Sequence, residues 1–471
     1  MMAYAARKKL WQVSTLVALV LTGCMVGPDF VPPTVETPAD YRFDAGEAAT
    51  EVNLKWWELF KDPILFDLVT ASLVNNRDVQ FAASRIEEAR AVLGFVGADR
   101  YPGIFIEGDA NTGNFLGISK SNSTDQAVFI GPTLNWEIDF WGKFRRATES
   151  ARAELLASEY ALRTVQLSLI SEVASTYNQL LDFRQRLHIS RNTLKSRLKT
   201  LDIIQQRFDQ GIIPELDLNQ AQIQKEIAAA AIPLFERQVA QTENALSILL
   251  GELPREIQSG QGLKYQVTPP EIPVGLPSTL LERRPDVAEA MYLLEAQTEQ
   301  IGVAEALRFP AFSLNGLMGV AGSDIAGDTS DGGVWRAGAG VFGPLYEFGK
   351  NLRRVEIEEA RARQTLYFYE NTVLTAFREV EDALVQIDTY DRQVAAVTRQ
   401  VAAARNANVL SLDRYDQGVT SYLEVLETER QYFNAELDLS ELYQLRINAY
   451  VGLYKALGGG WMTPEEMEST K

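Results

Sequence analysis

Hydrophobic and polar residues alternate along a segment centred near residue 133. The apolar side chains fall on one face, at Val128, Ile130, Leu134, Trp136, Ile138 and Phe140. The polar side chains fall on the other face, at Thr133, Asn135, Glu137 and Asp139. A period of two residues predicts a β-strand over about 127–141. Aromatic residues on one face and carboxylates on the other are typical of a membrane-barrel strand whose polar side faces a water-filled lumen.

A second segment, about 103–113, has the same alternation, with isoleucines opposite acidic residues and asparagine. It is predicted to be the antiparallel partner of the first strand. The polar stretch between them, GNFLGISKSNSTD, is expected to form an exposed hairpin loop. These two segments are therefore predicted to form a β-hairpin of a membrane barrel.

The pattern changes to a helical one after each strand pair. Residues 143–210 and 350–417 each run for 68 positions without proline and are rich in Ala, Leu, Glu, Gln and Arg. A continuous helix of that length extends about 100 Å at 1.5 Å per residue. Apolar residues such as Leu162, Val165 and Leu169 recur at helical spacing. Such a stripe predicts packing against a neighbouring helix.

A long repeat relates the two halves of the chain. RFDQG at 207–211 returns as RYDQG at 414–418, and the same offset of 207 aligns the Gly-Lys pair at 142–143 with that at 349–350. Self-similarity of this kind predicts two structural copies, 75–251 and 283–457. The glycine-rich segments at about 311–322 and 334–347, joined by SDIAGDTSDG, are predicted to be strands mainly because they occupy the equivalent places.

Each long helix is expected to turn back at its repeated pentapeptide. Glycine just past a helix end is typical of a left-handed C-terminal turn. The return helices are predicted over about 216–250 and 423–457, which completes helical hairpins at 143–250 and 350–457. The residues of the two tip turns are Arg207, Asp209, Gly211, Arg414, Asp416 and Gly418.

Proline separates these copies from the rest of the chain. Residues 24–74 and 252–282 contain several prolines each, so neither is one long helix. They are predicted to be extended segments, and 458–471 to be a C-terminal tail.

The N-terminus is typical of a secreted lipoprotein. Residues 1–23 have a basic start, an apolar run and small residues before Cys24, which is the only cysteine. The ending LTGC resembles the lipobox at which bacterial lipoproteins are cut and acylated on the cysteine. Met25 follows it, rather than the Asp that resembles an inner-membrane retention signal, so lipid-anchored delivery to the outer membrane is expected. No cysteine then remains for a disulfide.

Charge and composition exclude some classes of partner and some kinds of membrane segment. The formal net charge of −18 argues against nucleic acid, because phosphate binding depends on Lys and Arg. The chain after residue 24 has no stretch near eighteen consecutive apolar residues, so no transmembrane helix is expected there.

Residues for catalysis or metal binding are scarce. His188 is the only histidine, it lies in a predicted helix, and the single cysteine is assigned to the lipid. The aspartates at 324, 328 and 331 lack the spacing of a calcium loop, and no nucleotide-binding or hydrolase motif occurs. We therefore expect no enzyme activity, no metal site and no cofactor other than the covalent lipid on Cys24.

Several longer stretches resemble one protein family. They are CMVGPDFVPP, KWWELFKDPILFDLV, GLPSTLLERRPDVAEA, IGVAEALRFPAFSL, PLYEFGK and YKALGGGW, and they extend over nearly the whole chain after the signal segment. Together they resemble the TolC family of outer-membrane efflux proteins, in its lipoprotein branch.

The resemblance implies a mostly α-helical protein with a membrane β-barrel. Three subunits of such a homotrimer give four strands each to one twelve-stranded barrel, which continues into a long α-helical barrel in the periplasm. The resemblance also implies that the extended segments 24–74 and 252–282 form an equatorial belt. The implied function is a passive exit duct for drugs or other small molecules. The implied partners are outer-membrane lipid, a periplasmic adaptor, and an inner-membrane transporter of the resistance-nodulation-division type.

The resemblance also implies a constriction at the periplasmic tip. The family's leucine, acidic residue and arginine fall on Leu423, Glu427 and Arg430 of YLEVLETER, with Glu where Asp is usual. A ring of carboxylates favours cations, and a ring of leucines forms a dry narrowing. A core leucine and a solvated charge are the alternative interpretation of the first two residues.

Two other functions fit part of the sequence. An outlet of a type I protein secretion system would use the same fold. A lipid-anchored periplasmic coiled-coil scaffold would explain the lipobox and the long helices, but it leaves the alternating strand at 127–141 without a purpose.

Overall fold

The computed structural model describes residues 25–38, 40–43, 55–113, 125–258, 260, 262–265, 277–325 and 328–459. The signal segment, Cys24 and the loop at 114–124 lie outside these residues. The chain divides into two compact units, each made from three separate segments. The first comprises Met1–Thr34, Arg85–Glu159 and Glu289–Glu370, and the second comprises Val35–Ser84, Tyr160–Ala288 and Asn371–Lys471.

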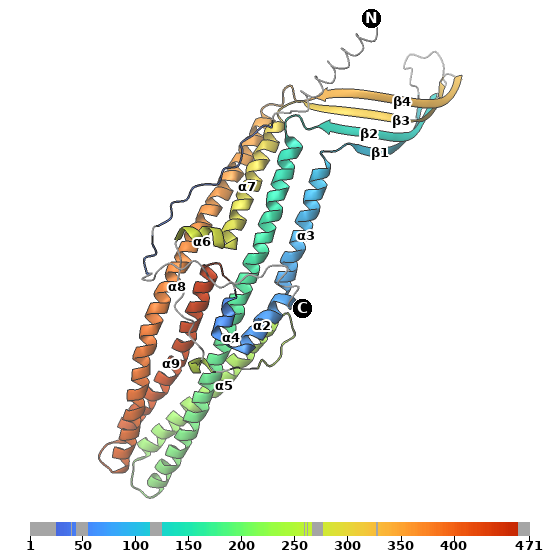
Figure 1. Ribbon diagram of the computed structural model, residues 1–471. Coiled ribbons are helices and arrows are strands. Elements are labelled where there is room, and N and C mark those ends of the chain that lie inside the picture. The colour runs from blue at the N-terminus through green and yellow to red at the C-terminus, as the bar shows by residue number, and fades with distance from the viewer. Residues whose placement is uncertain are drawn as a thin grey trace. The chain divides into compact units, whose positions relative to one another are not determined.

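The first unit contains a four-stranded antiparallel sheet in the order β1-β2-β3-β4 (Figure 1). Its strands are β1 (Gly103–Gly113), β2 (Asp125–Ile138), β3 (Ala311–Ile325) and β4 (Asp328–Phe342). All four predicted strands are present, but some bounds were wrong. The connection between β3 and β4 is shorter than expected, because most of SDIAGDTSDG pairs across the two strands, from Ser323 opposite Ser330 to Ile325 opposite Asp328.

The other bounds that differ lie where the strands join the helices. β2 ends at Ile138, and β4 ends at Phe342 shortly before Pro344. Proline has no N–H to donate to a strand ladder, and Gly142 and Gly349 have positive φ values of 80° and 81°. The chain therefore leaves the sheet here and enters the helices.

Among the described residues, four helices contribute to the first unit. They are the later parts of α3 (Arg77–Ala98) and α7 (Pro285–Ala306) and the early parts of α4 (Lys143–Asp209) and α8 (Lys350–Asp416). Ile301 and Ala304 of α7 form a small buried cluster with Val355 of α8. Gln300 of α7 donates a hydrogen bond to the Ser150 hydroxyl of α4, at 2.8 Å. Helix α7 thus packs against both long helices.

The second unit is built on the two helical hairpins. α4 returns through α5 (Glu215–Leu249), and α8 returns through α9 (Tyr422–Ala456), as predicted from the glycine turns. Four short elements lie beside them: η1 (Trp56–Phe60), α2 (Pro63–Asn75), η2 (Leu263–Tyr265) and α6 (Pro277–Arg283). No helix within the described residues has both the length and the apolar character needed to span a membrane.

Aromatic residues from distant segments form the core of the second unit. Trp56 of η1 stacks on Tyr454 of α9, with ring centroids 5.3 Å apart, and its indole donates to the Gly459 carbonyl. Asp62 caps α2 and also accepts a hydrogen bond from the Tyr177 hydroxyl of α4, at 3.0 Å. These contacts attach the segment before the first repeat to the helices.

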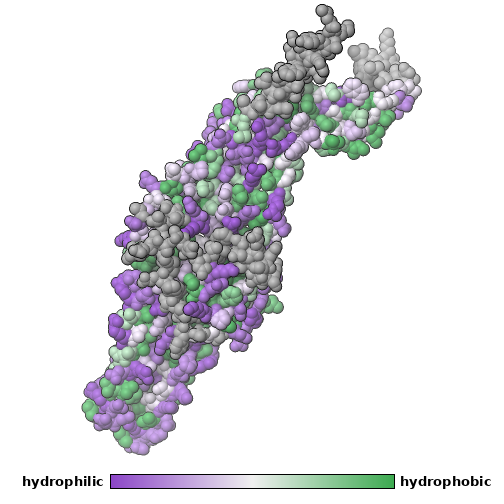
Figure 2. Space-filling model, in the orientation of Figure 1, coloured by the Kyte–Doolittle hydropathy of each residue, from purple (hydrophilic) through white to green (hydrophobic). Residues whose placement is uncertain are grey.

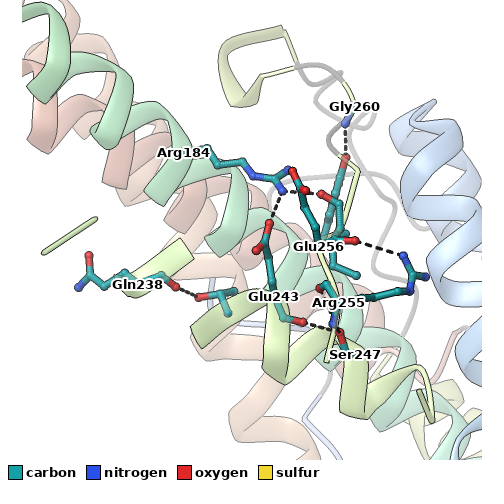
Figure 3. Close-up of polar contacts among 10 residues, drawn as sticks. Arg184, Gln238, Glu243, Ser247, Arg255, Glu256 and Gly260 are labelled. Carbon is teal, nitrogen blue, oxygen red and sulfur yellow. Dashed lines mark hydrogen bonds and ion pairs between the residues drawn. The ribbon is translucent and has the colours of Figure 1, made fainter. Parts of the chain in front are cut away.

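The proline-rich segment after α5 is attached by polar contacts (Figure 3). Arg184 of α4 pairs with Glu243 of α5 at 2.6 Å and also donates to the carbonyl of Ile257 in this segment. The Ser247 hydroxyl accepts from the backbone of Arg255, and the Gly260 N–H donates to the hydroxyl of Tyr177. The contacts hold Arg255, Ile257 and Gly260 against α4 and α5, in agreement with the prediction that this segment does not continue a helix.

The repeat is also visible in a tertiary contact that joins the start of each copy to the end of its own hairpin. Asn76, before α3, donates to the last carbonyl of α5 at Leu249, at 2.9 Å. Arg284, before α7, donates to the last carbonyl of α9 at Ala456, at 3.1 Å. The two donors are 208 residues apart and the two acceptors 207, so the same contact is made by different side chains.

Candidate functional site

The sheet has one strongly apolar face. The register places these residues on it: Ile104, Ile106, Val128, Ile130, Met318, Val320, Trp335 and Val341. All are exposed in the single chain, and Trp335 is 79% exposed. Figure 2 shows hydrophobic residues gathered on the sheet. An exposed apolar surface of this extent marks contact with lipid or with another protein.

The opposite face of the sheet is polar. It carries Glu107, Asp109, Asn111, Thr133, Asn135, Glu137, Asn315, Ser323, Ser330 and Arg336. A cavity of about 450 Å³ opens on the sheet, lined mainly from this face by residues such as Glu107, Asp109 and Ser330. Three of the four residues predicted to face a lumen, Thr133, Asn135 and Glu137, lie on this face, but none of them lines the cavity.

Asp139, the fourth predicted lumen residue, lies past the end of β2. Its carboxylate accepts hydrogen bonds from the backbone N–H groups of Phe144 and Arg145, at 3.0 and 2.9 Å. The Arg145 side chain pairs with the same carboxylate at 3.2 Å. A carboxylate at a helix N-terminus satisfies free N–H groups and is favoured by the helix dipole. The alternation thus continues in the sequence beyond β2 to Asp139, whose carboxylate caps the N-terminus of α4.

Aromatic residues cluster where the sheet meets the helices. The rings of Trp141 and Phe309 stack with centroids 4.5 Å apart, and those of Phe140 and Phe312 lie 5.3 Å apart. The Trp141 indole donates to the Pro310 carbonyl at 2.8 Å. Aromatic side chains with one polar contact are enriched at membrane–water interfaces, including the girdles of membrane barrels.

A buried arginine holds the segment just after Cys24, residues 25–34, which we term the N-terminal strap. Arg146 of α4 is 2% exposed and pairs with Glu299 of α7 at 2.8 Å. It also pairs with Asp29 at 2.8 Å and donates to the carbonyls of Val26 and Gly27. One guanidinium thus joins two helices to the strap.

The two hairpin tips have the same backbone geometry. The Gly211 N–H bonds the Phe208 carbonyl and the Ile212 N–H bonds the Arg207 carbonyl, at 2.8 and 2.9 Å. The second tip repeats this from Gly418 to Tyr415 and from Val419 to Arg414, at 3.0 and 2.9 Å. These are Schellman turns, with glycine φ values of 75° and 71°. The predicted role of both glycines is confirmed.

The predicted gate residues lie on one exposed face of α9, in its first turns. Leu423 is 60% exposed. Glu427 accepts two short hydrogen bonds from Arg430, at 2.8 Å, and one from Gln431. These donors, Arg430 first, hold the pKa of Glu427 below its ordinary value, so the carboxylate is charged at neutral pH. The structure brings the three residues together; their role as a constriction stays a prediction.

Two buried side chains of opposite charge lie between the hairpins, near the tips. Arg197 of α4 and Glu429 of α9 are both more than nine-tenths buried, and Arg197 donates to the carbonyl of Gln224. Burial lowers the pKa of Arg197 and raises the pKa of Glu429, although each charge favours the other. They line a cavity of about 350 Å³ together with His188 and Glu436. His188 itself contacts Asn192 at 2.8 Å and is an ordinary helix residue.

Sequence reasoning did not single out Arg146, Arg197, Glu429 or Arg284. Each lies within an amphipathic helix or at its start, where arginine and glutamate are usually solvated. For Arg284 a signal existed, because the RRPD stretch and the 208-residue offset align it with Asn76. For the others, no local pattern distinguishes a buried charge from an exposed one.

The matched family model agrees with this architecture. The model described as outer membrane efflux protein matches residues 68–252 and 276–459, one match for each structural copy. The chain belongs to this family, and the expected resemblance is confirmed. The family is one of outer-membrane efflux proteins rather than of enzymes.

Individual relatives match over nearly their full length. The chain is 33% identical over 452 residues to the cation efflux system protein CusC of Escherichia coli O6:H1, covering 94% of this chain and 97% of the relative. It is 34% identical over 456 residues to the solvent efflux pump outer membrane protein SrpC of Pseudomonas putida, with the same coverage. The solved structure of the outer-membrane channel OprN matches with a TM-score of 0.85 at 29% identity, over 93% of this chain and 100% of that one.

Proposed function

We propose that the protein is a passive trimeric exit duct in the outer membrane. The observation that carries this is the sheet, with its apolar face and its hollow polar face. Four strands cannot close on themselves, and β1 and β4 are edges of the sheet. Within a bilayer every backbone polar group needs a partner, so an open sheet must close with other copies. Three copies give the twelve-stranded barrel of the proposed assembly.

The two faces support this role over a periplasmic scaffold. A scaffold needs the hairpins but has no use for apolar residues such as Ile106 and Trp335 exposed across a sheet. In a closed barrel these residues face lipid, while Glu107, Asp109 and Arg336 line a wet lumen. The role needs no catalytic residue and no cofactor.

The proposed partners follow from the position of such a duct. The lipid on Cys24 anchors the strap to the outer membrane, and the hairpin tips meet a periplasmic adaptor that is bound to an inner-membrane transporter of the resistance-nodulation-division type. The cargo is small molecules or ions, since the relatives are named for cation and solvent efflux. A polar lumen of general character leaves the choice of cargo to the transporter.

The proposed gate is the ring formed by three copies of Leu423 and Glu427, with Arg430 beside it. The exposed positions of Leu423 and Glu427 on α9 support it, because both side chains are free to face a central pore. Three charged carboxylates favour cations, and three leucines narrow the water column. The repeat equivalents on α5 are Leu216 and Gln220, which carry no charge.

Conductance in planar lipid bilayers tests the proposed function. Leu423→Ala combined with Glu427→Ala is expected to raise single-channel conductance and reduce cation preference, since both the dry ring and the charge ring are removed. The matched control is Leu216→Ala with Gln220→Ala, which is expected to leave both values unchanged. Equal conductance of the gate variant and the wild type would place the constriction elsewhere, and absence of any channel activity from the wild type would refute the duct.

A further inference from the structure

The two hairpin tips of one chain are joined by an ion pair. Arg207, at the end of α4, pairs with Asp416, at the end of α8, at 2.8 Å. The same guanidinium lies over the ring of Tyr415, 5.0 Å from its centroid. A cation held between a carboxylate and an aromatic face makes two favourable contacts at once. This contact fixes the second tip beside the first.

The residues on the outer sides of both tips are the repeat equivalents of this contact. At the offset of 207, Arg414 corresponds to Arg207, Asp209 to Asp416, and Phe208 to Tyr415. Within the chain these residues do not meet. Arg414 is 54% exposed and pairs with Glu424 of its own hairpin at 3.3 Å, while Asp209 accepts a hydrogen bond from Gln205.

The equivalence is geometric as well as chemical. Both tips are Schellman turns with matching hydrogen bonds, so each arginine leaves its turn at the same position and each aspartate follows two residues later. The second tip therefore presents an arginine on its outer side, and the first tip presents an aspartate and an aromatic ring. One side of the chain is complementary to the other side of a second copy.

We propose that Arg414 of one subunit pairs with Asp209 of the next subunit, over the ring of its Phe208. This rests on the trimer of the proposed function. Closure of three chains then produces a ring of six arginine–aspartate pairs at the tips, three within chains and three between them. To enter the pair, Arg414 exchanges its contact with Glu424 for the carboxylate of the neighbour. A heterologous contact that closes after three steps requires two complementary sides of this kind.

Thiol crosslinking in the purified full-length protein tests the pairing, because Cys24 is the only natural cysteine and is assigned to the lipid. The variant Asp209→Cys with Arg414→Cys is treated with a short bismaleimide and separated on a denaturing gel. Covalent dimers and trimers are expected. The matched control, Arg207→Cys with Asp416→Cys, is expected to crosslink within the chain and to run as a monomer. Each single variant serves to reveal crosslinks through Cys24.

Native mass spectrometry of the same samples separates the possible failures. A trimeric variant that gives only monomers after crosslinking, while the control pair reacts, overturns the pairing and leaves the duct intact. A wild-type protein that is monomeric in detergent and in lipid overturns the pairing and the trimer together.

Charge reversal gives a second, independent readout. Arg414→Asp is expected to lower the temperature at which trimers dissociate in detergent, since it places two aspartates in each contact. Asp209→Arg combined with Arg414→Asp is expected to restore it. If the double reversal is no better than the single one, these residues do not face each other.

Discussion

The two hairpins share a backbone and differ in their side chains. α4 and α8 have 67 residues each, α5 and α9 have 35 each, and both tips are closed by the same glycine turn. On one stripe, however, α5 carries Leu216, Gln220 and Ile223 where α9 carries Leu423, Glu427 and Arg430. The backbone is thus duplicated, whereas the charges that define the proposed gate are present in only one copy.

The interior differs in the same way. Arg197 and Glu429 form the buried pair between the hairpins, and their repeat equivalents are Ala404 and Gln222. Within a chain, two buried opposite charges therefore lie where the first hairpin meets the second, beside the apolar cluster that contains Ile204 and Tyr422. In the proposed trimer the equivalent positions, Ala404 and Gln222, carry no charge, so hairpin contacts within and between subunits are expected to respond differently to substitution and pH.

The largest effect is expected from leaving one member of the buried pair alone. Arg197→Met should lower the free energy of unfolding by about 3–5 kcal/mol, because it strands a buried carboxylate. Arg197→Met with Glu429→Leu should recover most of this loss. Arg405→Met, on the exposed face of α8 next to the equivalent Ala404, should change it by less than about 0.5 kcal/mol. Urea unfolding in detergent measures all three, and a single variant no worse than the double would contradict the pairing.

The pH dependence of this pair should distinguish the wild type from the double variant. Because burial raises the pKa of Glu429, the folded state holds this proton more tightly than the unfolded state. The free energy of unfolding should therefore fall as pH rises from the ordinary glutamate value through the raised one. The double variant lacks this contribution, while His188 and Glu436 remain in both proteins. Between about pH 4 and pH 8, the free energy of unfolding of the wild type should fall relative to that of the double variant. If the difference between the two free energies does not change with pH, Glu429 does not have a raised pKa in the folded protein.

The tip glycines should show smaller effects that are equal in the two hairpins. Neither Gly211 nor Gly418 has an atom within 4 Å of the place where a Cβ would lie. The cost of Gly211→Ala or Gly418→Ala therefore comes from the left-handed φ alone, about 1–2 kcal/mol in each case. Unequal losses of unfolding free energy would show that the two turns are not equivalent in the assembled protein.

The smallest effect on stability is expected at the gate. Glu427 and Arg430 form an exposed pair one helical turn apart, and such pairs contribute little to folding. Glu427→Gln should leave the thermal unfolding temperature unchanged, as should the control Gln220→Ala. Only Glu427→Gln should reduce the cation preference of the channel. A marked loss of thermal stability would indicate that Glu427 supports the fold rather than the pore.

Local patterns predicted the elements well because local physics determines them. Alternation located β1 and β2, and Gly211 and Gly418 located the helix ends, since only a few neighbouring residues decide each outcome. The repeat located β3 and β4. The contacts of Arg146 and Arg197 were not predictable in this way. Their partners Glu299 and Glu429 lie more than 150 residues away in the sequence, and only the packing of α4 against α7 and α9 brings them together. At Asp139 a local pattern misled the prediction. The alternation of polar and apolar residues continues through Asp139, although β2 ends at Ile138.

The burial of Arg146 has a consequence for the response of the molecule to dissolved ions. Salt weakens attraction between exposed charges, with a screening length of about 8 Å at physiological ionic strength and about 3 Å at 1 M. The pair of Arg146 with Glu299 excludes solvent almost completely, whereas Asp416 in the tip pair is 61% exposed. Strong brine should therefore loosen the contact between the two tips while α4 and α7 stay joined through Arg146 and Glu299.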